Sequence, residues 1–124
     1  MDSRYKVLIV EDEERLRGVL TEVFENAGYV VASATNGAEG LCQLSRQQPD
    51  IVLTDLMMPV MDGLEFCNRA RLTSHVPILV LSSLAEEQGR TASLLAGATA
   101  YARKSTAMEE ILRQADGILA GDQG

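Results

Sequence analysis

Short apolar runs alternate along the chain with longer segments in which apolar residues recur at helical spacing. A continuous apolar run is typical of a buried parallel strand, because both faces of a parallel sheet are covered. The predicted strands are Lys6–Val10, Tyr29–Ser33, Ile51–Asp55, Ile78–Leu81 and the weaker run Ala98–Ala102. The predicted helices cover residues 16–27, 38–48, 64–72, 86–96 and 107–119.

Successive strands are separated by single helices, which favours parallel pairing with right-handed crossovers. Gly28 and Gly97 stand where helix C-termini favour glycine, and Ser105 or Thr106 is positioned to cap the last helix. We therefore expect an α/β fold, a doubly wound five-stranded parallel sheet with five helices. At 124 residues the chain fits one domain covering residues 1–124.

The charge balance restricts the partners. The formal net charge is −7 and the sequence pI is about 4.6, so the chain is expected to repel nucleic acid and anionic membranes. We expect no direct nucleic acid binding. The chain has no basic start followed by a long apolar stretch, and no apolar run approaches the roughly 18 residues that span a bilayer. A soluble, cytoplasmic protein without membrane contact is the expectation.

Cys42 and Cys67 lack the spacing of redox motifs and of zinc sites. Both have apolar neighbours in predicted helices, so we expect buried, reduced thiols without a functional role. His75 lies in a polar link and is expected to be solvated.

Polar side chains stand where the predicted strands end. Glu11 and Asp12 follow the first strand, Asp55 ends the third, Ser82 follows the fourth, and Lys104 closes the fifth. The carboxyl ends of parallel strands share one edge of a sheet, where the sites of open α/β folds lie. We expect these five residues to line a single edge.

Three clustered carboxylates need compensation. Two unit charges about 4 Å apart repel by roughly 4 kcal/mol at an effective dielectric of about 20. The repulsion is relieved by protonating an acid or by binding a cation. Hard oxygen ligands at a partly open site suit Mg²⁺, which keeps waters and takes one or two carboxylates.

Several motifs of the chain, taken together, are similar to those of a known family. The motifs are Glu11-Asp12, Asp55 with Met57-Met58-Pro59 and Met61-Asp62-Gly63, then Ser82, Tyr101 and Lys104. Together, and in this order, they resemble the receiver domain of bacterial two-component response regulators over nearly the whole chain. The resemblance implies a flavodoxin-like fold with strand order 2-1-3-4-5.

The resemblance also implies a chemistry. Asp55 accepts a phosphoryl group from a partner histidine kinase or histidine phosphotransfer protein. Asp12, Asp55 and the backbone carbonyl of Met57 bind Mg²⁺ directly, and Glu11 acts through a water. A domain of this kind is a phosphoacceptor signalling domain that assists its own phosphorylation and dephosphorylation, rather than an enzyme with a separate substrate.

The Ser82 hydroxyl and the Lys104 ammonium hold phosphoryl oxygens in such a domain, so Asp55, Ser82 and Lys104 form its catalytic set. Ser82 and Tyr101 form the family's switch, in which Tyr101 turns inward. The implied partners are a downstream protein or an output domain, and a dimer linked to phosphorylation. In the family, the face made by the fourth helix, the fifth strand and the fifth helix meets partners, so the resemblance implies an interface near Arg90, Tyr101, Arg103 and Met108.

The chain departs from the family pattern at one motif position, and two flanking positions are apolar. Ser105 replaces the usual proline after Lys104. A cis bond before a non-proline residue costs about 2.5 to 4 kcal/mol, so we expect a trans linkage there. Met57 and Leu84, which flank the phosphoryl group, cannot hydrogen-bond an attacking water. Slow self-dephosphorylation is the resulting hypothesis.

Two other functions share this fold. A flavodoxin would want a hydroxyl- and glycine-rich phosphate loop after the first strand, whereas this chain carries the acids of residues 11–14 there and has no tryptophan. The alternative is a pseudo-receiver, an interaction module that does not signal through phosphate. Ser105 is the feature that points to it.

Overall fold

The computed structural model describes residues 4–83 and 86–121, and its centre is a parallel sheet of five strands. Their spatial order is β2-β1-β3-β4-β5. The strands are β1 (Lys6–Val10), β2 (Val30–Ala34), β3 (Ile51–Asp55), β4 (Ile78–Ser82) and β5 (Ala100–Arg103). The strand order implied by the family resemblance is thereby confirmed.

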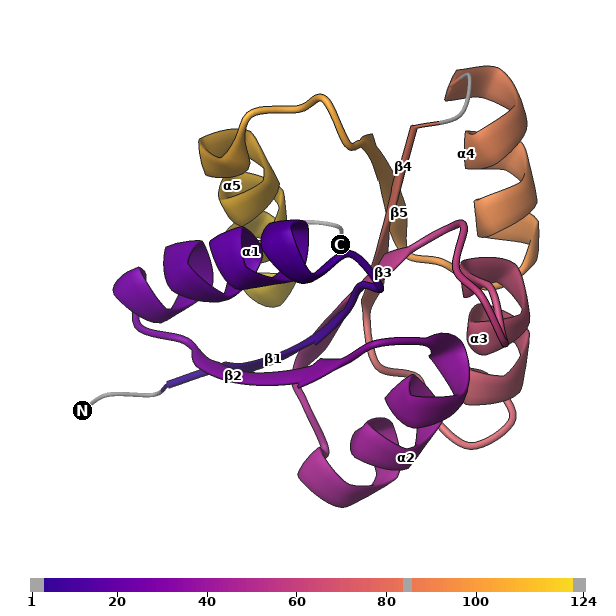
Figure 1. The fold of residues 1–124 in the computed structure, drawn as a ribbon, viewed down its shortest axis with the longest axis horizontal. Helices are drawn as coiled ribbons and strands as arrows, with labels where there is room; N and C mark the ends of the chain where they lie inside the picture. Colours follow the sequence, from indigo (N-terminus) through magenta and orange to yellow (C-terminus); the bar gives the residue numbers. More distant parts are fainter. Residues whose placement is uncertain (1–3, 84–85, 122–124) are drawn as a thin grey trace.

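Five helices cover the two faces of the sheet. They are α1 (Glu14–Asn26), α2 (Gly37–Gln47), α3 (Gly63–Ala70), α4 (Glu86–Leu95) and α5 (Met108–Leu119). Figure 1 shows α1 and α5 on one face, and α2, α3 and α4 on the other. None of the helices in the described ranges is long and apolar enough to cross a bilayer.

The core lies in two layers, one on each face of the sheet. Alternate residues of β1 point to opposite faces, so Val7 and Ile9 pack with Phe24 of α1 in one layer, while Leu8 and Val10 join the other. All residues of β3 and β4 are buried. The apolar runs are therefore strands covered on both sides, as their sequence predicts.

The helix ends agree with the glycine signals but not with the predicted last cap. Gly28 and Gly97 have φ angles of 98° and 110°, a conformation that glycine adopts without strain. At the start of α5 the N-cap position is Ala107, which makes no side-chain hydrogen bond. The predicted cap by Ser105 or Thr106 is wrong, because a turn in which the Thr106 amide donates to the Arg103 carbonyl places both residues before the helix.

The second strand begins one residue later than predicted, at Val30. The amide of Tyr29 donates to the Phe24 carbonyl, so Tyr29 belongs to the end of α1 rather than to the sheet ladder. Its ring meets Phe24 edge-on at 4.9 Å between centroids. Packing against the helix end thus outweighs the β propensity of this tyrosine.

Candidate functional site

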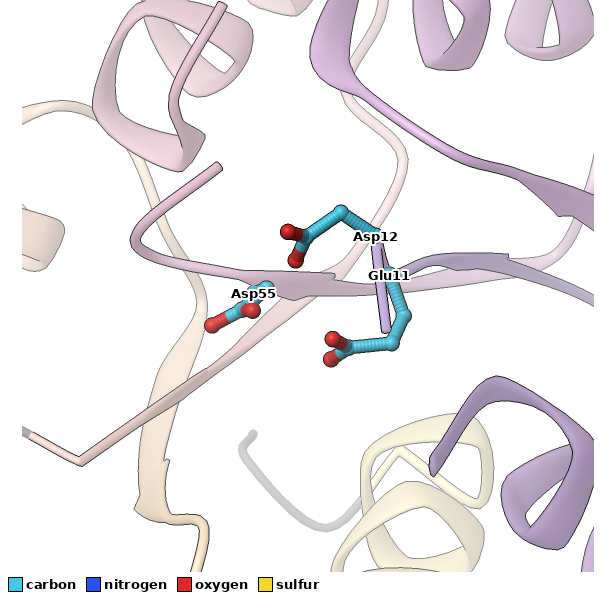
Figure 2. A group of neighbouring side chains, drawn as sticks. All are labelled: Glu11, Asp12 and Asp55. Atoms are coloured by element: carbon cyan, nitrogen blue, oxygen red, sulfur yellow. The ribbon is translucent and has the colours of Figure 1, made fainter. Parts of the chain in front are cut away.

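The ends of β1 and β3 bring three carboxyl groups together. Asp55 is the last residue of β3, and Val10 pairs with Thr54, so Glu11 and Asp12 leave β1 beside Asp55. Oxygens of these three side chains lie within 4.8 Å of one another. Figure 2 shows their carboxyl groups gathered at this edge of the sheet. The expected clustering of the acids is therefore present.

Lys104 supplies a positive charge to this cluster. Its Nζ donates to Asp55 Oδ2 at 2.8 Å and lies 3.6 Å from Glu11 Oε1. Burial alone would lower the pKa of Lys104, but the hydrogen bond to Asp55 and the negative charges of Asp55 and Glu11 together raise it. The ammonium group is thus held in its charged form between two acids.

The Glu11 side chain is 1% exposed, which is unusual for a carboxylate. Burial raises the pKa of Glu11 to about 7, and the charge of Asp55 adds to the rise, while the Glu13 amide and Lys104 oppose it. Glu11 Oε2 accepts a hydrogen bond from the Glu13 amide at 3.0 Å. Its other oxygen, Oε1, is buried and has no hydrogen-bond partner within the described part of the chain.

These features fit a hard divalent cation. The donor atoms are carboxylate oxygens, which Mg²⁺ and Ca²⁺ favour over nitrogen or sulfur. Asp12 is exposed at the mouth of the cluster, whereas Glu11 and Asp55 are buried. The buried Oε1 of Glu11 makes no hydrogen bond, and the Lys104 ammonium group that pairs with it lies 3.6 Å away, so this oxygen can still accept a proton, a water or a second cation. The cluster can therefore hold a metal ion.

The loop from β3 to α3 is tightly constrained. Gly63 donates to the Leu56 carbonyl, and a Cβ at Gly63 would lie 2.3 Å from the carbonyl oxygen of Asp55, so no larger residue fits. Val60 has a φ angle of 70°, and the amide of Met61 donates across it to the Pro59 carbonyl. Positive φ is rare for a β-branched residue. This strained turn holds the loop that follows Asp55.

The methionines of this loop differ in their packing. Met58 and Met61 pack against the core, but the side chain of Met57 is 58% exposed. The loop therefore turns the side chain of Met57 to solvent, although methionine is an apolar residue that commonly packs in cores. Met57 follows Asp55 by two residues, so an exposed apolar group stands close to the acidic cluster.

Ser82 and Tyr101 occupy the neighbouring strands. Ser82 ends β4 and is buried, and Asp55 pairs with Leu81, the residue before it. The amide of Lys104 donates to the Ser82 carbonyl at 2.8 Å. Tyr101 is 5% exposed and packs in the core layer on the α2, α3 and α4 face. The structure thus places Ser82 beside the cluster and Tyr101 inward, beneath α4.

The remaining predicted positions give a mixed result. His75 is exposed and Cys67 is buried, as predicted. The prediction of a buried Cys42 is wrong, because Leu41 and Leu44 are the residues that α2 turns toward the core and Cys42 lies on its solvent side. Leu84 lies outside the described residues.

Two contacts of Glu11 are not apparent in the sequence. The Arg17 guanidinium donates to the Glu11 carbonyl at 2.9 Å, and the Glu13 amide donates to the Glu11 carboxylate. Both contacts depend on how the chain turns from β1 into α1. The sequence does not reveal them, because residues 11–14 are all acidic and any of these side chains could accept a hydrogen bond from that turn.

Comparison with known proteins gives one consistent family. The model of the response regulator receiver domain matches residues 7–116. The transcriptional regulatory protein YrkP of Bacillus subtilis (strain 168) is 39% identical over 107 residues, covering 86% of this chain and 46% of that protein. Response regulator MprA of Mycobacterium sp. (strain KMS) is 38% identical over 115 residues, which cover 92% of this chain and 50% of that protein. The chain spans about half the length of the curated relatives it matches.

Solved structures agree with this family. A response regulator structure from Chloroflexus aurantiacus has 33% identity and a TM-score of 0.89, covering 95% of this chain and 99% of that chain. The BeF3-activated N-terminal receiver domain of RstA from Klebsiella pneumoniae has 28% identity and a TM-score of 0.88, and the match covers 92% of this chain and 97% of that chain. With the family model matching most of its residues and the strand order in agreement, the chain belongs to the response regulator receiver domain family.

Proposed function

We propose that residues 1–124 form a single receiver domain whose Asp55 accepts a phosphoryl group from the phosphohistidine of a kinase or phosphotransfer protein. The observation that carries this proposal is the position of Asp55, at the end of β3, with Lys104 at 2.8 Å and two further carboxyl groups beside it. A carboxylate nucleophile, a fixed cation and a candidate metal site are the parts that phosphoryl transfer needs.

The transfer itself is a displacement at phosphorus. An oxygen of the Asp55 carboxylate forms a bond to phosphorus as the P–N bond to the donor histidine breaks, and the electron pair of that bond stays with the histidine ring. Lys104 is placed to neutralise a phosphoryl oxygen, because its ammonium group already contacts Asp55. The Ser82 hydroxyl, at the end of the adjacent strand, is proposed to bind another.

Four residues would hold Mg²⁺. Asp12, Asp55 and the backbone carbonyl of Met57 would bind it directly, and Glu11 would act through a water. A bound Mg²⁺ ion neutralises the negative oxygens of the transferring group. The buried Glu11 oxygen without a hydrogen bond supports this assignment, since a water held by a cation would satisfy it.

The response to phosphate is proposed to reach the face formed by α4, β5 and α5. Ser82 lies on β4, between Asp55 and that face, and Tyr101 lies on β5, within it. Arg90, Arg103 and Met108 are the other partner residues expected there. The relatives are about twice as long as this chain, so a downstream protein or an output domain is the proposed recipient. A dimer formed on phosphorylation is a further proposed partner.

The alternative function, a pseudo-receiver module, rests on Ser105. The described part of the chain has no cis peptide bond, so the expected trans linkage between Lys104 and Ser105 is confirmed. Lys104 nevertheless reaches Asp55. This contact favours the phosphoacceptor over the pseudo-receiver.

A binding experiment with a phosphoryl analogue tests the proposal. The wild-type chain is titrated with beryllofluoride in the presence of Mg²⁺ while its amide resonances are followed. We expect saturable binding that is lost in Asp55→Asn. Asp116→Asn is the matched control, because Asp116 bonds Tyr29 and lies away from the acidic cluster. No saturable response of the wild type would favour the pseudo-receiver.

A further inference from the structure

A glycine inside α4 makes close contact with Tyr101. Gly89 is buried in the helix that covers β5, and a Cβ placed on it would lie 2.2 Å from the Tyr101 hydroxyl oxygen and 2.7 Å from its Cζ. Glycine weakens a helix interior relative to alanine, so a glycine there commonly has a packing reason. Here the tip of the Tyr101 ring occupies the space that a side chain would fill.

Shape, rather than hydrogen bonding, holds Tyr101 in place. Its hydroxyl is buried and has no hydrogen-bond partner among residues 4–83 and 86–121. The guanidinium carbon of Arg90 lies 5.8 Å from the centre of the ring, within the range of a cation–π contact. The inward position therefore depends on the notch at Gly89 on one side and on Arg90 at the ring face.

Tyr101 is also connected to the acidic cluster. It pairs with Val80, two residues before Ser82 on β4, and it precedes Lys104 by three residues on β5. The paired backbones of β4 and β5 are thus the route by which the position of the ring could reach Ser82 and Lys104.

We propose that Gly89 is the positioning residue of Tyr101: its missing side chain admits the ring to the inward position, and this sets the affinity of the Asp55 site for a phosphoryl group. The second part rests on the proposed function, in which Ser82 and Tyr101 form the switch. A side chain as small as a methyl group at residue 89 would expel the ring.

The test compares two glycines in helix interiors. Gly89→Ala adds a methyl group against Tyr101, whereas Gly18→Ala adds one in α1, where nothing lies within 4 Å. Both changes replace a glycine with a better helix former, and only Gly89→Ala also adds a close contact with Tyr101. Ring-proton NMR should show an Overhauser contact between Tyr101 and residue 89 in wild type. We expect Gly18→Ala to retain the buried ring and Gly89→Ala to expose it to a soluble paramagnetic agent.

Beryllofluoride affinity in the presence of Mg²⁺ provides the functional measurement. We expect Gly89→Ala to weaken binding at least about fivefold, the lower end of common coupling between sites. In a Tyr101→Ala background the same change should have no effect, because nothing remains to expel. The double variant also tests folding: if Gly89→Ala alone does not fold, removal of the ring should restore the fold.

Each contrary result is specific. A Tyr101 ring that stays buried in Gly89→Ala, or a double variant that folds no better than an unfolded Gly89→Ala, overturns the steric role of Gly89. An expelled ring with unchanged beryllofluoride affinity overturns its coupling to Asp55. A wild-type chain that binds no beryllofluoride refutes the proposed function instead, and the ring measurement still decides whether Gly89 admits Tyr101.

Discussion

The Lys104 ammonium lies 2.8 Å from Asp55 Oδ2, although 49 positions separate the two residues in the chain. The contact exists because β3 and β5 end at the same edge of the sheet, on either side of β4. It places a fixed positive charge against the acid that we propose as phosphoacceptor. The proposed chemistry follows from this pair and from the two acids beside it.

Removing the Lys104 charge should destabilise the chain. Lys104→Met leaves Glu11 and Asp55 without their cation, and breaking a fully buried pair commonly costs about 3 to 5 kcal/mol. The Lys104 side chain is 25% exposed, so we expect a smaller loss, about 2 kcal/mol in the free energy of unfolding at pH 8. Urea denaturation without divalent ions measures it.

Lys104→Arg is the matched control for this change, since it retains the positive charge. It should recover most of the stability lost in Lys104→Met. If both variants unfold at the same urea concentration as the wild type, the ion pair between Lys104 and Asp55 does not stabilise the fold.

The contribution of Glu11 to the stability of the metal-free chain should fall as pH rises from 4.5 to 7. Burial raises the Glu11 pKa from 4.5 to about 7, so in this window the folded chain binds a proton that the unfolded chain has released. By linkage, the free energy of unfolding then decreases with pH, by about 3 kcal/mol over the window. Urea denaturation at pH 4.5 and 7.5 measures the change.

Glu11→Gln is the control, because it removes the titration while preserving the size of the side chain. The free energy of unfolding of Glu11→Gln should lack the fall of about 3 kcal/mol between pH 4.5 and 7 that Glu11 causes in the wild type. Mg²⁺ should stabilise the wild type more at pH 7.5 than at pH 5.5, since protonated Glu11 contributes no negative charge to the site. Parallel pH profiles of the two proteins would contradict the raised pKa of Glu11.

Loss of the phosphoryl group should accelerate when Met57 becomes polar. Met57 is 58% exposed beside the acidic cluster and offers no hydrogen bond to an attacking water. Met57→Asn adds one, and a hydrogen bond of about 1 kcal/mol corresponds to a roughly fivefold faster decay. Decay of the phosphorylated chain after removal of the donor gives the rate. Leu72→Asn, at an exposed apolar side chain that follows α3 and lies outside this loop, should leave the rate unchanged. Equal rates in wild type and Met57→Asn would remove the hypothesis of slow self-dephosphorylation.

The two thiols should react differently. Cys42 is exposed, whereas Cys67 is buried, and burial raises the Cys67 pKa to about 11. Reactivity requires an accessible thiolate, so only Cys42 should be alkylated in the folded chain. Mass spectrometry after iodoacetamide treatment measures this, with Cys42→Ser as the variant that should remain unlabelled until it is unfolded. Labelling of Cys67 in folded Cys42→Ser would show that α3 opens readily.

The sequence predicts the strand ends well, because parallel strands that are buried on both sides appear as continuous apolar runs. Asp55 and Lys104 could be placed at one edge of the sheet from these runs alone. The inward position of Tyr101 could not, because it depends on a notch that another helix provides. Gly89 left a signal, an isolated glycine inside a predicted helix, but nothing in the sequence shows which ring would fill it.

Other features depended on tertiary geometry that periodicity does not contain. Cys42 has apolar neighbours and still faces solvent, because Leu41 and Leu44 take the inward positions of α2. Met57 is apolar and is nevertheless exposed in the loop between β3 and α3, whereas Met58 and Met61 of the same loop pack against the core. The missing cap at Ala107 likewise follows from the turn after β5.

Covalent labelling of the chain shows whether Asp55 is the phosphoacceptor. Wild type, Asp55→Asn and Asp116→Asn are incubated with acetyl phosphate and Mg²⁺, and their intact masses are measured. We expect the added mass of one phosphoryl group in wild type and in Asp116→Asn and none in Asp55→Asn. Chelating Mg²⁺ before the donor is added should abolish the gain in wild type. Wild-type chain that gains no phosphoryl group, or Asp55→Asn that gains one as readily, would contradict this assignment.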